Sequence, residues 1–250
     1  MLNEQTIDKM QEMRLFGMAQ LFREIMGKPQ HADLSHEEFV GLLMDAELTT
    51  RQDKRLKRLL RDAHLKQQAC LEDIDYKHTR GLHKQILLGL ANCSWITNRQ
   101  NVLISGPTGV GKTYIACALG NAVCRAGYKT LYIRAPKLFT TLYQSQADGS
   151  YLKYLSKLAK MDLLIIDDLG LTPMGDTERK DFMEVVEDRN LTCSMIVASQ
   201  VPVKNWYEII GDPTIADAIC DRLLHHAYKI ELSGESMRKT NLETDKRKKI

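Results

Sequence analysis

Residues 106–113 constrain this chain most. Their sequence, GPTGVGKT, matches the pattern GxxxxGK[ST] at every fixed position, between a strand-like apolar segment at 101–105 and a helix-period segment at 114–125. Glycines let the backbone curl so that successive N–H groups point at one anion, and the following helix adds its positive end. A plain glycine-rich turn would not need that strand and helix. The pattern therefore predicts a nucleotide-binding loop made of Gly106, Pro107, Thr108, Gly109, Val110, Gly111, Lys112 and Thr113.

Two carboxylates, Asp167 and Asp168, end a predicted buried strand, a pattern that fits a Walker B element. We expect Lys112 to reach the β- and γ-phosphates, while Thr113 and Asp167 hold Mg²⁺. Asp168 would orient and deprotonate the attacking water. A chance pair of aspartates at a strand end is common, but this pair follows a complete phosphate-binding loop after one intervening strand. The sequence thus predicts an ATPase with ATP and Mg²⁺ as cofactors.

Polar side chains further along complete the predicted site. Ser199 and Gln200 follow the next apolar segment. Either side chain would position the water or sense the γ-phosphate, and we include Gln200 among the predicted catalytic residues. The alternative is that both residues simply form a polar turn. Arg222, in a helix-period segment before the last strand, is the better candidate for an arginine finger that acts across a subunit interface. Arg238 is a second arginine near the carboxyl end.

The composition allows a sizeable core and a smaller second unit. The chain has 250 residues, 44% of them hydrophobic, and a formal net charge of +3, so any nucleic-acid signal must be local. No apolar run approaches the roughly 20 residues that span a bilayer, and the amino terminus is too polar and acidic for a secretory signal. The six cysteines form no CxxC pair, which favours buried thiols and a cytoplasmic protein.

The distribution of apolar residues divides the chain near residue 80. Residues 1–68 are predicted to form a small all-helical domain, and residues 69–85 a linker. Residues 86–250 alternate strand-like and helix-like segments, as an α/β domain should. Near-continuous apolar runs predict a parallel sheet covered on both faces, with strands at 101–105, 130–133, 163–166, 194–198 and 228–232.

A basic helix marks the amino-terminal domain. Ser35 and Glu38 have the spacing of a capping box at a helix start. Further along, six basic side chains cover less than half of a helix circumference, with only Asp53 as negative charge within the run. Like charges at i,i+4 repel by roughly a few tenths of a kcal/mol, and a polyanion would relieve this repulsion and release counterions. An acidic protein or a solvated face is the alternative to DNA contacts from Arg51, Lys54, Arg55, Lys57, Arg58 and Arg61.

The motifs GPTGVGKT, LLIIDDLG, ASQ and CDRL, in that order, resemble those of AAA+ ATPases of the DnaA/DnaC initiator clade. More closely, the whole chain is similar to the IstB family of helper ATPases in insertion-sequence transposition, including MRLFGMAQLFREI and RLKRLLRDAHLK near its amino end. The resemblance implies an AAA+ P-loop fold with a parallel five-stranded sheet and little or no lid. It also implies a nucleotide-dependent homo-oligomer on duplex DNA that recruits and activates a partner transposase of the IstA type.

The same resemblance implies roles for single residues. Arg222 becomes the arginine finger, and Arg238 matches loosely the sensor II position, which contacts the nucleotide. Asp168 stands where glutamate is commoner, and its shorter side chain favours slow hydrolysis. Initiator-clade members carry an extra helix in the region that corresponds to 136–160, which suggests phosphate contacts from Lys153 and Lys157.

Two rival functions remain open from the sequence. A replicative helicase loader of the DnaC type would share every motif of the ATPase domain and would differ in the partner bound by the amino-terminal region. A nucleotide-switched DNA-binding module would use ATP for assembly and hardly turn it over. Turnover measured with and without DNA separates that module from an active ATPase.

Overall fold

The computed structural model describes residues 2–26, 34–76 and 80–237. The chain forms two compact units, Met1–Arg58 and Leu59–Ile250. Each unit has its own buried core. The two are described separately below.

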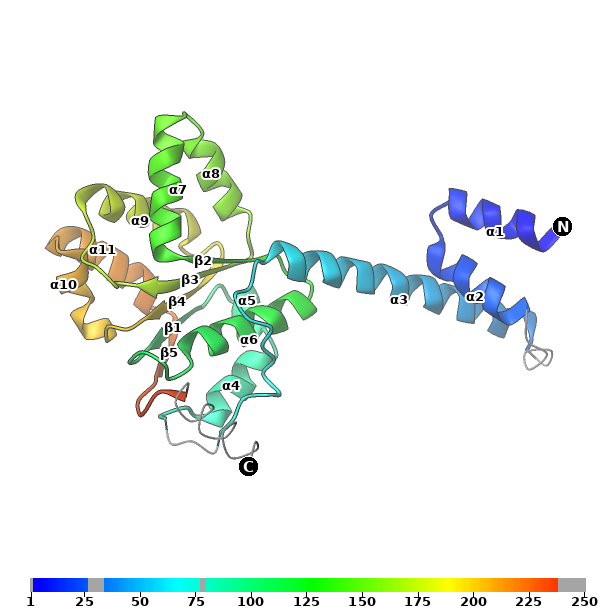
Figure 1. The fold of residues 1–250 in the computed structure, drawn as a ribbon, viewed down its shortest axis with the longest axis horizontal. Helices are drawn as coiled ribbons and strands as arrows, with labels where there is room; N and C mark the ends of the chain where they lie inside the picture. The colour runs from blue at the N-terminus through cyan, green and yellow to red at the C-terminus, as the bar shows by residue number, and fades with distance from the viewer. Residues whose placement is uncertain (1, 27–33, 77–79, 238–250) are drawn as a thin grey trace, which may run out of the picture. The chain divides into compact units, whose positions relative to one another are not determined.

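The first unit is helical (Figure 1). It contains α1 (Leu2–Glu12), α2 (Phe16–Met26) and the first part of α3 (His36–Asp62). Its buried core consists of Ile7, Ala19, Phe22 and Leu43. The predicted capping box is confirmed, because the Glu38 N–H donates to Ser35 Oγ (3.2 Å) and the Ser35 N–H donates to Glu38 Oε2 (2.9 Å). Pro29, where the sequence predicts the end of the preceding helix, lies outside the described residues.

The second unit is built on one parallel sheet, as predicted. The strands lie in the order β2-β3-β4-β1-β5, and every neighbouring pair is parallel. Parallel strands carry their carboxyl ends at one edge of the sheet, which is where ligands bind in open α/β folds. Their bounds are β1 Asn101–Ser105, β2 Thr130–Arg134, β3 Leu163–Leu169, β4 Ser194–Ser199 and β5 Ala227–Glu231.

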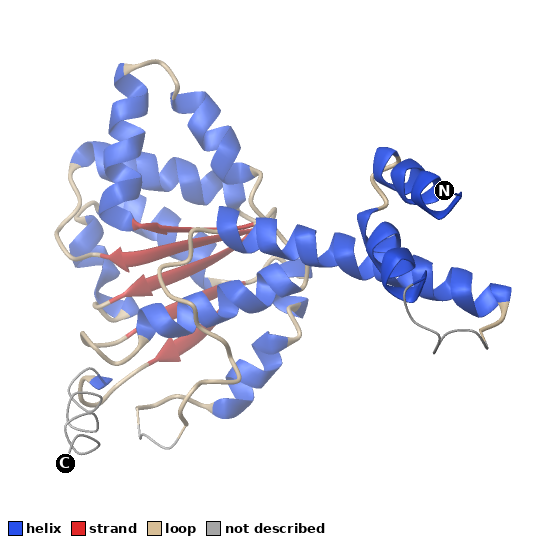
Figure 2. Ribbon diagram, turned by 45° about the vertical axis from the view of Figure 1, so that its right-hand side comes forward, coloured by secondary structure: helices blue, strands red, loops and turns tan. Residues whose placement is uncertain are grey.

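Helices cover both faces of this sheet (Figure 2), which explains why its strands are apolar on both sides. Alternate residues of β1 enter different cores, Val102 and Ile104 on one face and Leu103 on the other. The first core includes residues of α4 (Lys84–Ala91), α5 (Ser94–Thr97) and α6 (Lys112–Arg125). The second core includes residues of α7 (Ala135–Ala147), α8 (Tyr151–Ala159), α9 (Asp176–Arg189), α10 (Trp206–Ile210) and α11 (Pro213–Leu224), and η2 (Val203–Asn205) precedes α10.

The stretch between the predicted helical domain and ATPase domain is packed rather than extended. The compact units divide after Arg58, ahead of the expected boundary at 68. Ala69, Leu71 and Ile74, which we expected in a linker, are buried in the core that covers the α6 face of the sheet. The Tyr132 N–H donates to the main-chain oxygen of Ala63 (2.8 Å), so the end of α3 is attached to β2. Residues 59–76 therefore belong to the second unit.

No helix within the described parts of the chain combines the length and the apolar character that crossing a membrane would require.

Candidate nucleotide-binding site

The loop after β1 has the backbone that the glycine pattern requires. Gly106, Gly109 and Gly111 have φ values of 147°, 89° and 99°, a region that other residues rarely adopt. A Cβ atom on Gly106 would lie 2.3 Å from the main-chain oxygen of Leu232, so no larger residue fits there. α6 starts at Lys112, so the last two residues of the loop also begin its first turn, and the free N–H groups and dipole of the helix favour an anion at this end.

Lys112 turns back over the loop. Its side chain is buried, and Nζ donates to the main-chain oxygens of Gly106 (2.7 Å) and Pro107 (2.8 Å). The ammonium group therefore lies over the concave loop, among the groups that would surround a phosphate chain.

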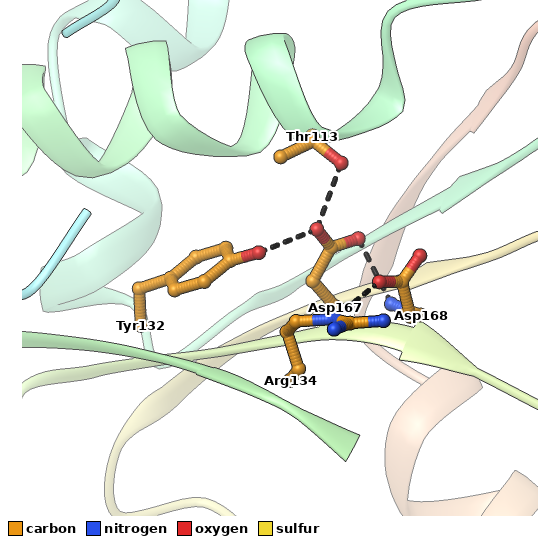
Figure 3. A network of polar contacts seen from close by, with 5 residues as sticks. All are labelled: Thr113, Tyr132, Arg134, Asp167 and Asp168. Atoms are coloured by element: carbon orange, nitrogen blue, oxygen red, sulfur yellow. Dashed lines mark hydrogen bonds and ion pairs between the residues drawn. The ribbon is translucent and has the colours of Figure 1, made fainter. Parts of the chain in front are cut away.

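A hydrogen-bond network fixes the first Walker B carboxylate (Figure 3). Asp167 is fully buried, and its Oδ2 accepts from Thr113 Oγ1 (2.8 Å) and Tyr132 Oη (2.7 Å). Its Oδ1 accepts from the Asp168 N–H (2.9 Å). Burial and the neighbouring Asp167 carboxylate raise the pKa of the Tyr132 hydroxyl far above its usual range, so this hydroxyl stays protonated and acts as a donor. Tyr132 was not predicted, although a hydroxyl group in the middle of a largely apolar predicted strand was a usable signal.

The second Walker B carboxylate has a strained backbone and a cationic partner. Asp168 has φ +60°, uncommon for a residue with a side chain, and the β3–β4 register shifts between Ile166 and Leu169. This irregularity breaks the alternation that would otherwise send two successive side chains to opposite faces. Arg134 Nε donates to Asp168 Oδ2 (2.7 Å, Figure 3), and this hydrogen bond and charge raise the pKa of Arg134.

Lys112, Thr113 and Asp168 line one cleft of about 440 Å³, within the usual range for a small-molecule site. Residues from the phosphate-binding loop, from the ends of β3 and β4, and from the packed stretch before the sheet line it together, among them Arg80, Thr108, Lys112, Thr113, Asp168 and Gln200. Predicted residues of three separate sequence segments, together with residues of the packed stretch before the sheet, thus meet at the carboxyl edge of the sheet.

The geometry separates the two candidates that follow β4. Ser199 is fully buried, donates to the main-chain oxygen of Leu169 (2.8 Å) and accepts from the Val201 N–H (3.1 Å). Gln200 lines the cleft, and its Oε1 accepts from Thr108 Oγ1 (2.7 Å). Ser199 is thus committed to the backbone, and Gln200 is the polar side chain near the loop.

Arg80 is a cleft residue that sequence reasoning missed. It is only 6% exposed, and its guanidinium donates to the main-chain oxygens of Val110 (3.1 Å) and Asp75 (2.9 Å). It thereby attaches the packed stretch before the sheet to the phosphate-binding loop. An isolated arginine in a presumed linker has no motif that would have revealed this contact.

Arg222 lies at the opposite edge of the sheet from the cleft. The side chain of Asn101, the first residue of β1, donates to the main-chain oxygens of Arg222 (3.5 Å) and Leu223 (3.4 Å), whereas the loop follows the last residue, Ser105. Among the described residues that line the cleft, Arg222 is absent. Arg238 lies outside the described residues, and its role stays a prediction.

Several cations of the basic helix have intramolecular partners, among them Arg51, Lys54 and Arg61. Arg51 Nε pairs with Glu47 Oε1 (2.7 Å), and Lys54 Nζ lies 4.2 Å from the centre of the Phe16 ring. Arg61 pairs with its neighbour Asp62 (2.9 Å). The side chains of the other predicted contacts are exposed on α3 or on α8, namely Arg55, Lys57, Arg58, Lys153 and Lys157.

The oxygen atoms near the loop suit a hard cation. The Thr113 hydroxyl and the Asp167 and Asp168 carboxylates are the kind of ligand that Mg²⁺ takes, together with phosphate oxygens and water. Within the described residues, no group of three or more His, Cys, Asp or Glu side chains forms a metal site by itself. This fits a metal held jointly by the protein and a nucleotide.

Comparison with known proteins agrees with this geometry. Residues 8–244 match the family described as IstB-like ATP binding protein. The chain belongs to this family. It is 45% identical to the insertion sequence ATP-binding protein y4pL of Sinorhizobium fredii over 239 residues, which cover 96% of this chain and 98% of the relative. It is 31% identical to the IS21 ATP-binding protein of Pseudomonas aeruginosa over 82% of this chain and 78% of the relative. The predicted resemblance is confirmed.

Solved structures show the fold of this IstB-like protein. DnaI superposes with a TM-score of 0.57 at 23% identity, over 70% of this chain and 93% of DnaI. AMPPCP-bound DnaA from Aquifex aeolicus superposes with a TM-score of 0.57 at 19% identity, over 74% of this chain and 56% of DnaA. These likenesses confirm the predicted AAA+ P-loop fold.

Proposed function

We propose that this IstB-like protein is a Mg²⁺-dependent ATPase that assembles as a homo-oligomer on duplex DNA and recruits and activates the transposase of its insertion sequence. The observation that carries the proposal is the convergence of Lys112, Thr113, Asp168 and Gln200 on one cleft, where Thr113 also donates a hydrogen bond to the buried Asp167. A nucleotide-binding loop alone would need only the first two.

In the proposed hydrolysis, side chains of this chain bind the nucleotide and activate the water. Lys112 and the loop N–H groups bind the phosphates, and Thr113 with Asp167 holds Mg²⁺, which neutralises phosphate charge. Asp168 accepts the proton of the attacking water, and Gln200 orients that water. DnaA, which has the same fold, is known in an AMPPCP-bound form, and this supports ATP as the nucleotide.

The position of Arg222 supports the proposed assembly. Its own cleft lies at the other edge of the sheet, so the arginine serves a neighbouring subunit if it contacts nucleotide at all. An arginine finger contributes roughly 10³- to 10⁵-fold to the rate in other P-loop NTPases. A single subunit would then hydrolyse ATP slowly, and oligomers formed on DNA would hydrolyse it faster.

Duplex DNA is the partner proposed for the exposed basic residues of α3 and α8. Lys153 and Lys157 are one helical turn apart on an exposed face of α8, and Arg55, Lys57 and Arg58 are exposed on α3. Contacts of this kind bind phosphates without reading bases. The DnaA structure with AMPPCP and single-stranded DNA supports nucleic-acid binding on this fold.

The transposase is favoured over a helicase as the protein partner. Curated relatives that cover nearly the whole chain at 42–45% identity are insertion-sequence ATP-binding proteins. The likeness to the DnaC helicase loader, at 18% identity, concerns the fold. The relatives therefore support a partner encoded with the insertion sequence, and we propose the helical unit as its contact.

The test compares wild type with Lys112→Ala in phosphate release, DNA binding and sedimentation, each with ATP, ADP or no nucleotide. Wild type should form ATP-dependent oligomers on duplex DNA, hydrolyse ATP faster there, and stimulate strand transfer by the transposase. Nucleotide-independent DNA binding would contradict the proposal. ATP-dependent assembly without turnover would identify the switch module instead, and stimulation of helicase loading but not of strand transfer would identify a loader.

A further inference from the structure

Two contacts hold the guanidinium of Arg222. Its Nε donates to Glu187 Oε2, and its Nη1 donates to the main-chain oxygen of Ala218 (2.9 Å). Its Nη2 makes no hydrogen bond with the residues that the structure describes. The arginine is therefore fixed on one side and has free donors on the other.

The backbone that carries Arg222 is itself anchored. The Asn101 side chain donates to the main-chain oxygens of Arg222 and Leu223 (3.5 and 3.4 Å) while its Oδ1 accepts from the Met195 N–H (2.9 Å). The end of α11 is thereby tied to β1 and β4.

The carboxyl end of α9, the helix that carries Glu187, is also anchored by hydrogen bonds. Arg189, 1% exposed, donates to the main-chain oxygens of Leu158 (2.7 Å), Met161 (2.9 Å) and Ser194 (2.7 Å). α9 and α11 also share a buried core that includes Phe182, Val186, Ile219 and Leu223, and the two helices lie side by side in Figure 1. The carboxylate and the guanidinium thus project from two anchored helices.

The pair lies at the surface, where it contributes little to stability. The Glu187 side chain is 52% exposed and that of Arg222 is 25% exposed, and ion pairs between exposed side chains add little to stability. Its geometric effect is larger, because an arginine side chain loses much rotamer freedom when it is held in one orientation.

We propose that Glu187 is a positioning residue for Arg222, which it orients toward the nucleotide of a neighbouring subunit. This inference rests on the proposed function, in which Arg222 acts across an interface. The Glu187 carboxylate accepts the hydrogen bond from Arg222 Nε. Nη2 of the same guanidinium is then available to donate to a γ-phosphate oxygen. A misplacement of about 1 Å at such a contact lowers a rate by roughly 100-fold.

The test uses Glu187→Ala with a matched control, Asp188→Ala. Asp188 is the next residue, is exposed, and makes no side-chain hydrogen bond among the described residues. On DNA, Glu187→Ala should lower kcat by about 10- to 100-fold, less than Arg222→Ala. ATP affinity and thermal unfolding should stay at wild-type values, Glu187→Gln should keep part of the rate, and Asp188→Ala should behave as wild type.

Mixing variants separates a positioning role from a structural one. Lys112→Ala subunits have a disabled loop but an intact Glu187–Arg222 pair, and Glu187→Ala subunits have an intact loop. Mixed oligomers should regain part of the hydrolysis, because some interfaces then pair the intact loop of a Glu187→Ala subunit with the oriented Arg222 of a Lys112→Ala subunit. Unchanged or raised hydrolysis in Glu187→Ala, or no recovery on mixing despite co-assembly, would overturn the inference. If Arg222→Ala itself hydrolyses ATP normally, the interface role in the proposed function fails as well.

Discussion

Arg134 Nε lies 2.7 Å from Oδ2 of Asp168, so the carboxylate proposed as the base is paired with a cation of its own subunit. Arg134 is the last residue of β2, and α7 starts directly after it. An attacking water would have to compete with this guanidinium for the same oxygen. We therefore expect Arg134 to limit hydrolysis by an isolated subunit.

Replacing Arg134 with alanine should raise basal phosphate release about 3- to 10-fold, because the carboxylate becomes available to water. Arg134→Lys keeps the charge and should stay near wild type. ATP affinity should change little in either variant. A fall in hydrolysis with Arg134→Ala would show instead that the pair holds Asp168 in its working position.

Replacing Tyr132 with phenylalanine removes one of the two donors to Asp167 Oδ2. The loss of a buried hydrogen bond to a charged group should lower the free energy of unfolding by about 2 kcal/mol. The Mg²⁺ concentration for half-maximal hydrolysis should rise, because the carboxylate is less well oriented.

The stability difference between wild type and Tyr132→Phe should depend on pH. The pKa of Tyr132 is raised in the folded state, so its contribution is fully present below the unfolded value of about 10 and declines as pH rises further. Denaturant titrations at several pH values test this, and a difference that grows above pH ~10 would contradict it.

Replacing Lys112 with alanine should lower ATP affinity about 100-fold, since a charge-assisted contact to phosphate is lost. The fold should persist, because the ammonium group donates to main-chain oxygens within the loop itself. Fluorescent-nucleotide titration measures the affinity, and circular dichroism serves as the folding control. Wild-type affinity in this variant would refute the loop assignment.

Glu47 is expected to stabilise the helical unit. It is 6% exposed and accepts hydrogen bonds from the Gly17 N–H (2.7 Å), the Met18 N–H (3.3 Å) and Arg51 Nε (2.7 Å). Glu47→Ala leaves the N–H groups at the start of α2 without this acceptor and should cost about 2 kcal/mol. Glu24→Ala, at an exposed position of α2, is the control.

The contribution of Glu47 should also depend on pH. Burial opposes its ionisation, but the hydrogen bonds from Arg51, Gly17 and Met18 outweigh burial and lower its pKa. Its stabilisation is therefore present above the unfolded value of about 4.3 and is lost as pH falls through the folded value. The free energies of unfolding of wild type and Glu47→Ala should therefore converge as the pH is lowered. A difference that stays constant with pH would contradict this expectation.

Neutralising Arg55 and Arg58 together should weaken DNA binding about equally for all sequences and reduce the salt slope by about one unit per lost contact. Arg51→Ala is the informative comparison, because Arg51 is paired with Glu47. Arg51→Ala should lower the free energy of unfolding of the helical unit, and it should change the salt slope of DNA binding little. An unchanged salt slope in the double variant would show that this face of α3 is solvated and does not contact DNA phosphates.

The sequence by itself determined the phosphate-binding loop, the Walker B strand and the parallel sheet. Each depends on residues close together in the chain: glycines that permit positive φ, a lysine and threonine at the start of a helix, and apolar runs with a strand's length. Such local requirements leave a pattern at fixed spacing. This is why Lys112, Thr113, Asp167 and Asp168 were predicted without a structure.

Only the tertiary structure decided which distant side chains meet. It buried Ser199 and left Gln200 at the cleft, placed Tyr132 and Arg134 against the two aspartates, attached Arg80 to the loop, and paired Arg222 with Glu187. These contacts join segments separated by tens of residues, and either partner could occur at many spacings. No local backbone requirement fixes such a spacing, because strand order and helix packing set the distance between the partners.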